Sequence, residues 1–485
     1  MKTLSLFFII LLYNFTFSQA PSIQWQKSYG GSGLEAAESI QQTSDGGYIV
    51  AGCSNSNDGD VSGNHGGQFD YWIVKLDVNG IIQWQKSLGG SAPLGGFGSE
   101  YATSIQQTYD GGYIVAGQSD SNDGDVSGNH GLYDCWVVKL DPNGILQWQK
   151  SYGGSGWDRA NSIQETTDGG YIVAGWSSSN DGDVSGNIYF FDNYWIVKLD
   201  VNGIIQWQRT FGGDSGGGET TSIQQTFDGG YIVAGFYTDN GGDVTGNHGQ
   251  FDYWIVKIDA FGILQWQKSL GGSVEDYANS IQQTSDGGYI VAGQSNSNDG
   301  DVSGNHGEPD YWIVKLDPNG IIQWQKSLGG SSWDVASAIQ QTTDGGYIVA
   351  GLSSSNDGNV TGNHGDGDLW VVKLDLNGNI EWQKSYGGSG GEGAHSIQET
   401  SDGGYIVAGL SYSNDGDVSG NHGNSDVWVV KLNPEAVGLI EVLNNPAATC
   451  IKIMDITGRE TDRQANTLLF YLYNDGTVEK KVIIE

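Results

Sequence analysis

The tripeptide Trp-Gln-(Lys/Arg) recurs seven times in this chain of 485 residues, and this repetition constrains the fold more than any other feature. The copies are spaced 58 to 64 residues apart and begin at Trp25, Trp84, Trp148, Trp207, Trp266, Trp324 and Trp382. Two further markers, Asp-Gly-Gly-Tyr-Ile-Val-Ala-Gly and Trp-(Ile/Val)-Val-Lys, also occur seven times each. Because such repeats are single supersecondary units that pack on their neighbours, we expect seven like units instead of several different domains.

Each unit is predicted to contain four short antiparallel strands, which we call a to d. In the first unit they cover residues 39–43, 47–54, 71–77 and 81–87, which are β-branched and aromatic runs bounded by Gly, Asn and Asp. Glycines in the a–b and c–d links supply the positive φ of tight hairpins. Strand c carries large apolar side chains on both faces. Its sheet must therefore be sandwiched between two others, as a propeller blade is.

The two ends of the repeat array predict how the ring closes. Residues 23–28 form a lone strand d, whereas the seventh unit contains strands a, b and c and stops at Leu432. The first strand is therefore expected to complete the last blade, which also shields the edges of an open array. The sequence predicts an all-β fold, a seven-bladed β-propeller of four-stranded antiparallel blades closed by the N-terminal strand. A solenoid is the alternative, but it would need capping units that the sequence does not show.

The charge of the chain limits its partners. Asp and Glu number 57 against 21 Lys and Arg, which gives a formal net charge of -36. Nucleic acid and anionic membrane surfaces are bound through basic patches, so neither is expected as a partner. Cations and neutral polymers such as glycans remain. The three cysteines lie at non-equivalent positions of the repeat and predict no disulfide framework.

The N-terminus predicts export. Residues 1–20 begin with Met1-Lys2-Thr3, continue with an apolar stretch and end in small residues, as a secretory signal peptide does. An uncleaved membrane anchor is the alternative, although the apolar run is short for a membrane span. No later segment is apolar enough to cross a bilayer, so the mature chain is expected to have no transmembrane segment.

Two regions resemble known families. The motifs Ser-Asp-Gly-Gly-Tyr-Ile-Val-Ala-Gly and Asp-Tyr-Trp-Ile-Val-Lys-Leu-Asp, within residues 21–432, resemble the β-propeller repeats of secreted and surface proteins of Bacteroidota. Residues 451–461 and 473–485 resemble the C-terminal sorting domain of type IX secretion cargo. The resemblance implies a small β sorting module at 433–485, the type IX secretion machinery as a partner, and a protein that is secreted or held on the outer cell surface. A β appendage of unrelated purpose is the alternative.

The long b–c loops of three units have the spacing of calcium ligands. Oxygen side chains at positions 1, 3 and 5, Gly at 6 and a carboxylate at 12 are typical of a calcium loop. The predicted ligands are Asp299, Asp301, Ser303, Asn305 and Asp310 in the fifth unit, Asp123, Asp125, Ser127 and Asp134 in the second, and Asp415, Asp417, Ser419 and Asp426 in the seventh. The other units depart from the pattern. A loop held by side-chain-to-backbone turns is the alternative.

Two more polar positions recur. Six units carry a loop histidine, and we expect no function for it because equivalent positions stand too far apart to share an ion: His65, His130, His248, His306, His364 and His422. Every unit has an acid near the start of strand a: Glu35, Glu100, Asp158, Glu219, Asp276, Asp334 and Glu392. Paired carboxylates can hydrolyse glycosidic bonds. A structural turn residue is the alternative.

The near-identity of the units favours binding over catalysis. A catalytic site needs different groups in distinct roles, whereas these units offer the same groups seven times, which suits multivalent binding. Because successive strands alternate in direction, the long b–c and d–a loops lie on one face, where we expect the ligand. Specific recognition is expected where the units differ, which is at residues 91–99, Trp157, residues 188–191, residues 214–218 and Trp333. The sequence predicts an exported, non-enzymatic scaffold that binds a glycan, a protein or a surface component and is stabilised by calcium. The alternative is an extracellular carbohydrate-active enzyme that uses the d–a carboxylates.

Overall fold

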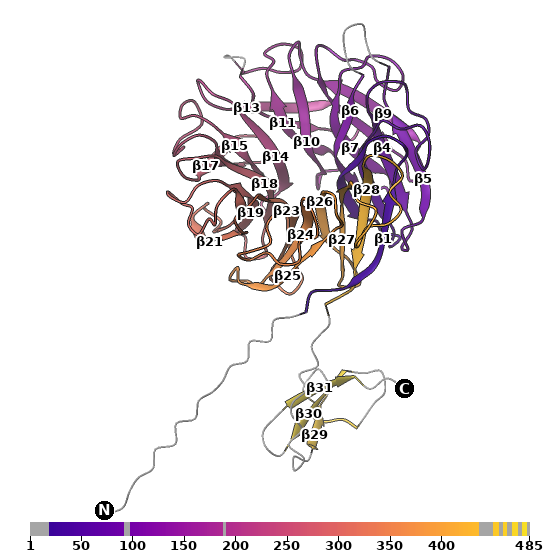
Figure 1. Cartoon of the computed structure of the whole chain (residues 1–485). Helices are drawn as coiled ribbons and strands as arrows, with labels where there is room; N and C mark the ends of the chain where they lie inside the picture. Colours follow the sequence, from indigo (N-terminus) through magenta and orange to yellow (C-terminus); the bar gives the residue numbers. More distant parts are fainter. Residues whose placement is uncertain are drawn as a thin grey trace, which may run out of the picture. The chain divides into compact units, whose positions relative to one another are not determined.

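Seven four-stranded antiparallel sheets surround a central axis in the computed structural model of the chain (Figure 1). The structure describes residues 19–91, 98–187, 191–435, 450–454, 459–462, 468–473 and 478–482. In each sheet, strand a lies next to the axis and strand d lies on the outside (Figure 1). The predicted seven-bladed all-β propeller is confirmed.

The strands have nearly the same length in every blade. The first blade contains β2 (Glu35–Gln42), β3 (Tyr48–Ser54), β4 (Asp70–Leu76) and β5 (Ile82–Leu88), and the second contains β6 (Glu100–Gln107), β7 (Tyr113–Ser119), β8 (Asp134–Leu140) and β9 (Leu146–Tyr152). The third contains β10 (Asp158–Glu165), β11 (Tyr171–Ser177), β12 (Asn193–Leu199) and β13 (Ile205–Phe211), and the fourth contains β14 (Gly218–Gln225), β15 (Tyr231–Tyr237), β16 (Asp252–Ile258) and β17 (Leu264–Leu270). The fifth contains β18 (Asp276–Gln283), β19 (Tyr289–Ser295), β20 (Asp310–Leu316) and β21 (Ile322–Leu328), and the sixth contains β22 (Asp334–Gln341), β23 (Tyr347–Ser353), β24 (Asp368–Leu374) and β25 (Ile380–Tyr386).

The seventh blade closes the ring as predicted. It consists of β26 (Glu392–Glu399), β27 (Tyr405–Ser411) and β28 (Asp426–Leu432), together with β1 (Ile23–Tyr29) from the other end of the chain. β1 pairs antiparallel with β28, from Ile23 opposite Leu432 to Tyr29 opposite Val427. The N-terminal strand therefore occupies the position of strand d and covers an edge that β28 would otherwise expose.

Strand a is longer than the sequence predicted. β2 begins at Glu35 instead of residue 39, and its register against β3 shifts between Ala37 and Ser39. The other blades show the same shift, which is a β-bulge that breaks the alternation of inward and outward side chains. The strand was predicted from β-branched and aromatic residues, and residues 35–38 contain none, so the part before the bulge was missed. The bulge matters for the site because it carries the repeated acid into the sheet.

The hydrophobic core lies between blades. Trp312 of the fifth blade is fully buried in a cluster that also contains Ile232, Ala234 and Tyr253 of the fourth blade. The Tyr253 hydroxyl donates a hydrogen bond of 2.9 Å to the Trp312 carbonyl oxygen. Similar clusters join the other neighbouring blades, so each blade depends on both neighbours for its packing. The predicted sandwiching of strand c is confirmed.

The chain divides into two compact units after Glu435. In the second unit, β29 (Cys450–Met454), β30 (Leu468–Tyr473) and β31 (Val478–Val482) form a small antiparallel sheet in that order. The described residues include no helix long and apolar enough to cross a membrane. Nearly all of the predicted signal peptide at 1–20, and parts of the predicted sorting module at 433–485, lie outside the described residues.

Candidate ligand-binding clefts between blades

The long b–c and d–a connections lie together on one face of the ring, as predicted from the alternating direction of successive strands. Asp299, in the b–c loop of the fifth blade, accepts a hydrogen bond of 2.8 Å from the Ser273 amide in the preceding d–a connection. In the same pair of loops, the Asp301 amide donates a hydrogen bond of 2.9 Å to the Gly271 carbonyl oxygen. These contacts make the loops a packed layer that can position side chains rigidly.

The predicted calcium ligands of the fifth unit have other partners. Asp299 is bound to the d–a connection, and Asp310 accepts hydrogen bonds from the backbone and the ring of His306. Ser303 accepts a hydrogen bond from Gln325, and the Asn305 side chain donates one of 2.8 Å to the Ser295 carbonyl oxygen and accepts one from the Gly307 amide. The side-chain oxygens that were predicted to surround one calcium ion therefore form hydrogen bonds to different partners. The second and seventh units repeat this pattern at Asp123, Asp125, Ser127, Asp134, Asp415, Asp417, Ser419 and Asp426.

This arrangement does not fit a calcium ion, which takes six to eight oxygen ligands at 2.3–2.6 Å. Within the described ranges, no three His, Cys, Asp or Glu side chains lie close enough together to hold a metal. The loop would have to rearrange to bind calcium, so calcium binding stays a prediction from the loop sequence and is not expected in this conformation of the loop.

We expect calcium to leave the stability of the protein unchanged. A ligand that binds only the native state at one hundred times its Kd would raise the free energy of unfolding by about 2.7 kcal/mol. The measurement is the melting temperature of the full chain in excess calcium and in excess chelator. A calcium-dependent rise in melting temperature that Asp299→Asn abolishes would show that the loop rearranges and binds the ion.

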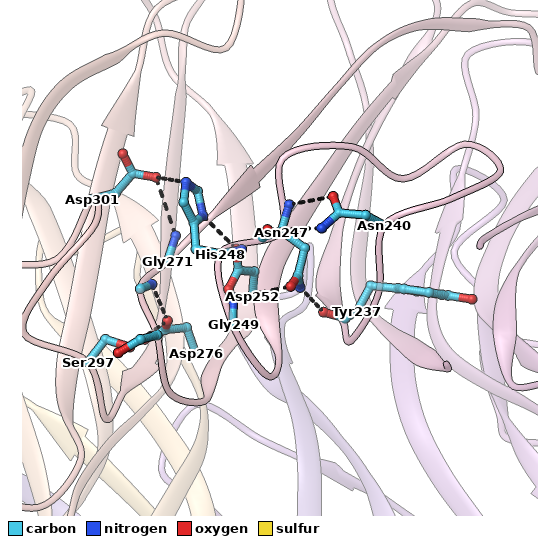
Figure 2. A network of polar contacts seen from close by, with 12 residues as sticks. Tyr237, Asn240, Asn247, His248, Gly249, Asp252, Gly271, Asp276, Ser297 and Asp301 are labelled. Atoms are coloured by element: carbon cyan, nitrogen blue, oxygen red, sulfur yellow. Dashed lines mark hydrogen bonds and ion pairs between the residues drawn. The ribbon is translucent and has the colours of Figure 1, made fainter. Parts of the chain in front are cut away.

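The loop histidines each bind an aspartate of their own blade, and two of them also reach the next blade, although the sequence suggested no function for them. In six blades, the histidine Nδ1 lies 2.5–2.7 Å from the first carboxylate of strand c. His248 illustrates the second contact (Figure 2): its Nδ1 pairs with Asp252, and its Nε2 points at Asp301 of the next blade, 3.9 Å away. The equivalent distance from His65 to Asp125 is 3.3 Å. Each of these two rings therefore bridges a buried carboxylate and one that is about a third exposed.

The acids at the start of strand a are buried. Six of them are at most 1% exposed: Glu35, Glu100, Asp158, Asp276, Asp334 and Glu392. Asp276 accepts hydrogen bonds from the Gly272 amide at 2.8 Å and from the Ser297 hydroxyl at 3.0 Å, and it also binds Ser295 (Figure 2). Burial raises the pKa of Asp276 to about 6. These carboxyl groups are held by the fold and are not presented to solvent.

Each buried acid meets a second one from the preceding blade. A Cβ on Gly271 would lie 2.5 Å from Asp276 Oδ2 and 2.8 Å from Asp252 Oδ1, so both carboxyl groups reach the same glycine. Within the described chain, Asp252 Oδ1 is buried with no hydrogen-bond partner. The same orphan oxygen recurs at Asp70, Asp134, Asp310, Asp368 and Asp426. Burial raises the pKa of Asp252, and a proton held between the two neighbouring carboxyl groups would give the orphan oxygen a partner.

The interface between the third and fourth blades lacks this pair. Asn193 replaces the strand-c carboxylate, Gly218 replaces the strand-a acid, and Tyr237 replaces the serine. The Tyr237 hydroxyl donates a hydrogen bond of 2.6 Å to Asn193 and accepts one from the Gly213 amide. The loop histidine is absent from this unit as well. Because these residues are replaced together, the sequence could have revealed that the loop histidine, the strand-c aspartate and the strand-a acid form one contact network.

Three clefts of nearly equal volume open between blades. Their volumes are about 530 Å³ between the seventh and first blades, and about 540 Å³ both between the second and third and between the fourth and fifth. Each is lined by strand d and the b–c loop of one blade, and by the c–d hairpin and the b–c loop of the next. They are therefore the same cleft, repeated by the fold.

The cleft between the fourth and fifth blades combines charged, polar and apolar side chains. Lys268, His248 and Asp301 supply a cation, an imidazole and a carboxylate, and Ile321 supplies an apolar wall. Ile321 follows the hairpin glycine Gly320 and is 60% exposed. The corresponding lining residues are Lys150, His130, Asp183 and Ile204 in the second cleft, and Lys27, His422, Asp60 and Ile81 in the third.

The unequal aromatic positions also lie at the long-loop face. Trp157 stacks on Tyr133 of the preceding blade with ring centroids 4.9 Å apart, and Arg159 lies over both rings and over Trp176. Trp333 occupies the equivalent position in the connection between the fifth and sixth blades and is 55% exposed. The structure therefore does not bring the two tryptophans into one site.

The comparisons with known proteins assign no family to the chain. No protein-family model matches the chain, and no curated protein matches its sequence. Among solved structures, the Pan2 WD40 domain of Neurospora crassa is similar over 85% of this chain and 96% of that one, with 11% identity and a TM-score of 0.47. A streptogramin B lyase is similar over 84% and 98% of the two chains, with 12% identity and a TM-score of 0.45. A protein of unknown function from Bacteroides caccae has 14% identity over 66% and 91%, with a TM-score of 0.38. At such identities a shared fold does not identify an activity.

Proposed function

We propose that the chain is an exported, non-enzymatic scaffold that binds a glycan, a protein or a surface component. The observation that carries this proposal is the repetition of one cleft, with the same lysine, histidine, aspartate and isoleucine, at three blade interfaces. Catalysis needs unlike groups around one substrate, whereas equal sites on a rigid ring suit repeated binding. The net charge of -36 favours ligands other than nucleic acid.

The burial of the repeated acids weighs against the enzymatic alternative. A glycosidase needs two carboxyl groups that flank the scissile bond. Here Asp276 and Asp252 are both fully buried, and both carboxyl groups lie beside Gly271. A polymer could reach them only if the blade interface opened.

Binding and turnover can be separated in one screen of the full chain. We expect at least one member of a panel of soluble polysaccharides and extracellular proteins to bind, without release of new reducing ends. Binding is measured by biolayer interferometry and turnover by a reducing-sugar assay. Polysaccharide cleavage that Asp276→Asn or Glu100→Gln abolishes would favour the enzymatic alternative.

We propose export by the type IX route on the strength of the C-terminal resemblance and the small sheet of β29 to β31. In a bacterium with a type IX system, the full chain is expected outside the outer membrane, whereas a chain ending at Glu435 is expected to stay in the periplasm. Fractionation and surface proteolysis report the two locations. Equal surface exposure of both chains would show that the C-terminal segment is unrelated to sorting.

A further inference from the structure

We infer that the repeated clefts between blades are saccharide-binding sites, which lets one polymer of repeating sugars engage the ring at several points. This inference rests on the proposed function and names its ligand and its place. A volume of about 540 Å³ lies within the range of ordinary small-ligand sites. It is large enough for one or two sugar rings.

The lysine in each cleft has its ammonium group available. In the described chain, no side-chain hydrogen bond or ion pair joins the ammonium group of Lys27, Lys150 or Lys268 to another residue, although acidic residues outnumber basic ones by 57 to 21. By contrast, the lysines of strand c are all paired: Lys75, Lys139, Lys198, Lys257, Lys315, Lys373 and Lys431. The strand-d lysines are thus donors that the fold itself does not use.

The next blade supplies a carboxylate acceptor whose position is fixed by a histidine of the same blade as the lysine. His248 is oriented by its hydrogen bond to buried Asp252, and the Asp301 carboxylate beside it is about a third exposed (Figure 2). A carboxylate accepts hydrogen bonds from two neighbouring hydroxyl groups, and an ammonium group donates up to three. Vicinal hydroxyls of a sugar offer both partners in one small group, which matches Lys268 on one side and Asp301 on the other.

The apolar wall suits the carbon face of a sugar ring. Ile81, Ile204 and Ile321 are 53%, 57% and 60% exposed at the tips of their hairpins, which leaves their methyl groups uncovered. A pyranose carries C–H groups on one face and hydroxyls at its rim, so it can bury this apolar surface while its hydroxyls meet the polar wall. Burying apolar surface contributes roughly 25 cal/mol per Å².

The interface between the third and fourth blades provides an internal comparison. Its strand d has Arg209 and Thr210 in place of lysine and serine. Arg209 also donates hydrogen bonds to the Gln208 and Phe261 carbonyl oxygens. This cation is used by the fold, and its contact with Phe261 ties it to the c–d hairpin of the next blade, so no saccharide is expected there.

Calorimetric titration of the full chain with cellotetraose, xylotetraose, mannotetraose and laminaritetraose tests the inference. We expect at least one tetrasaccharide to bind at three to five equivalent sites, since lysine, histidine and aspartate also recur at the first–second and sixth–seventh interfaces. The matching polysaccharide should bind about 100-fold more tightly than the tetrasaccharide, because several sites act on one chain.

Single substitutions locate the sites. Lys268→Gln and Lys150→Gln should each remove one site from the stoichiometry and leave the melting temperature unchanged. Arg209→Gln is the matched control and should leave the stoichiometry unchanged. Ile321→Ala should weaken the cleft of the fourth and fifth blades while keeping its lysine.

The outcomes distinguish this inference from the proposed function. A stoichiometry of one, or a stoichiometry that the two lysine variants leave intact, would overturn the inference. If no tetrasaccharide binds while a protein of the panel does, the saccharide inference fails and the binding scaffold stands. If nothing in either panel binds, both fail.

Discussion

A chain that lacks residues 21–29 is expected to lose the single cooperative unfolding transition of the closed ring. β1 supplies strand d of the seventh blade, and Tyr29 at its end is buried and bonded to the Gly80 carbonyl oxygen of the first blade. The deletion therefore exposes the edge of β28 and uncouples the last blade from the first. Burial of a large side chain contributes about 1.5–3 kcal/mol and each hydrogen bond about 1 kcal/mol, so we expect a loss of roughly 5 kcal/mol or more.

Calorimetry and urea unfolding measure this loss. A chain that lacks only residues 1–18 is the control and should unfold in one transition, since β1 is intact. A synthetic peptide of residues 19–30, added to the deleted chain, should restore the transition in a concentration-dependent way. If the deleted chain unfolds at the same urea concentration as the control, β1 does not hold the ring closed.

The sequence was sufficient for the architecture because the architecture is periodic. Seven copies of Trp-Gln-(Lys/Arg) and a last unit without strand d left one closed arrangement, in which residues 23–28 complete the final blade. The beginning of strand a was missed because residues 35–38 have no β-branched or aromatic side chain and precede a bulge between Ala37 and Ser39. Periodicity thus revealed the blades but not their irregular ends.

The candidate site was harder to predict because its residues meet across blades. Loop spacing suggested that Asp299, Asp301 and Asp310 share an ion, yet each of them has a different partner in the fold. The cleft draws Lys268 from one blade and Ile321 from the next, which are far apart in sequence. Spacing within a loop cannot report such contacts. The joint replacements at the third and fourth blades could have pointed to the carboxyl pair, but not to the cleft.

The free energy of unfolding should fall as the pH rises from about 4 to about 7. Burial raises the pKa of Glu100 to about 7 and that of Asp276 to about 6, whereas unfolded Glu and Asp titrate near pH 4.3 and 3.9. The folded state therefore binds more protons in this range. The contribution of these groups is fully present below the unfolded pKa and is lost as the pH rises through the folded pKa.

The pair of Asp276 and Asp252 shows how one substitution should remove part of this dependence. Asp276 faces Asp252, and Asp252 in turn faces His248, which points at Asp301. In Asp252→Asn, the amide oxygen can accept from His248 and the amide nitrogen can donate to Asp276, so the pair no longer needs a proton. Asn193 is the chain's own precedent for a neutral residue at this position.

We expect Asp252→Asn to narrow the difference in stability between pH 5 and pH 8 by about 1–3 kcal/mol, since one unit of pKa corresponds to about 1.4 kcal/mol. Urea unfolding between pH 5 and pH 8 measures this difference. Glu308→Gln is the control, because it removes one negative charge at an exposed position, and it should leave the pH dependence of the free energy of unfolding unchanged. An equal slope in Asp252→Asn and the parent chain would mean that the pair is ionised throughout. The orphan oxygen of Asp252 would then need a partner other than a proton, since a buried carboxylate without one costs too much to persist.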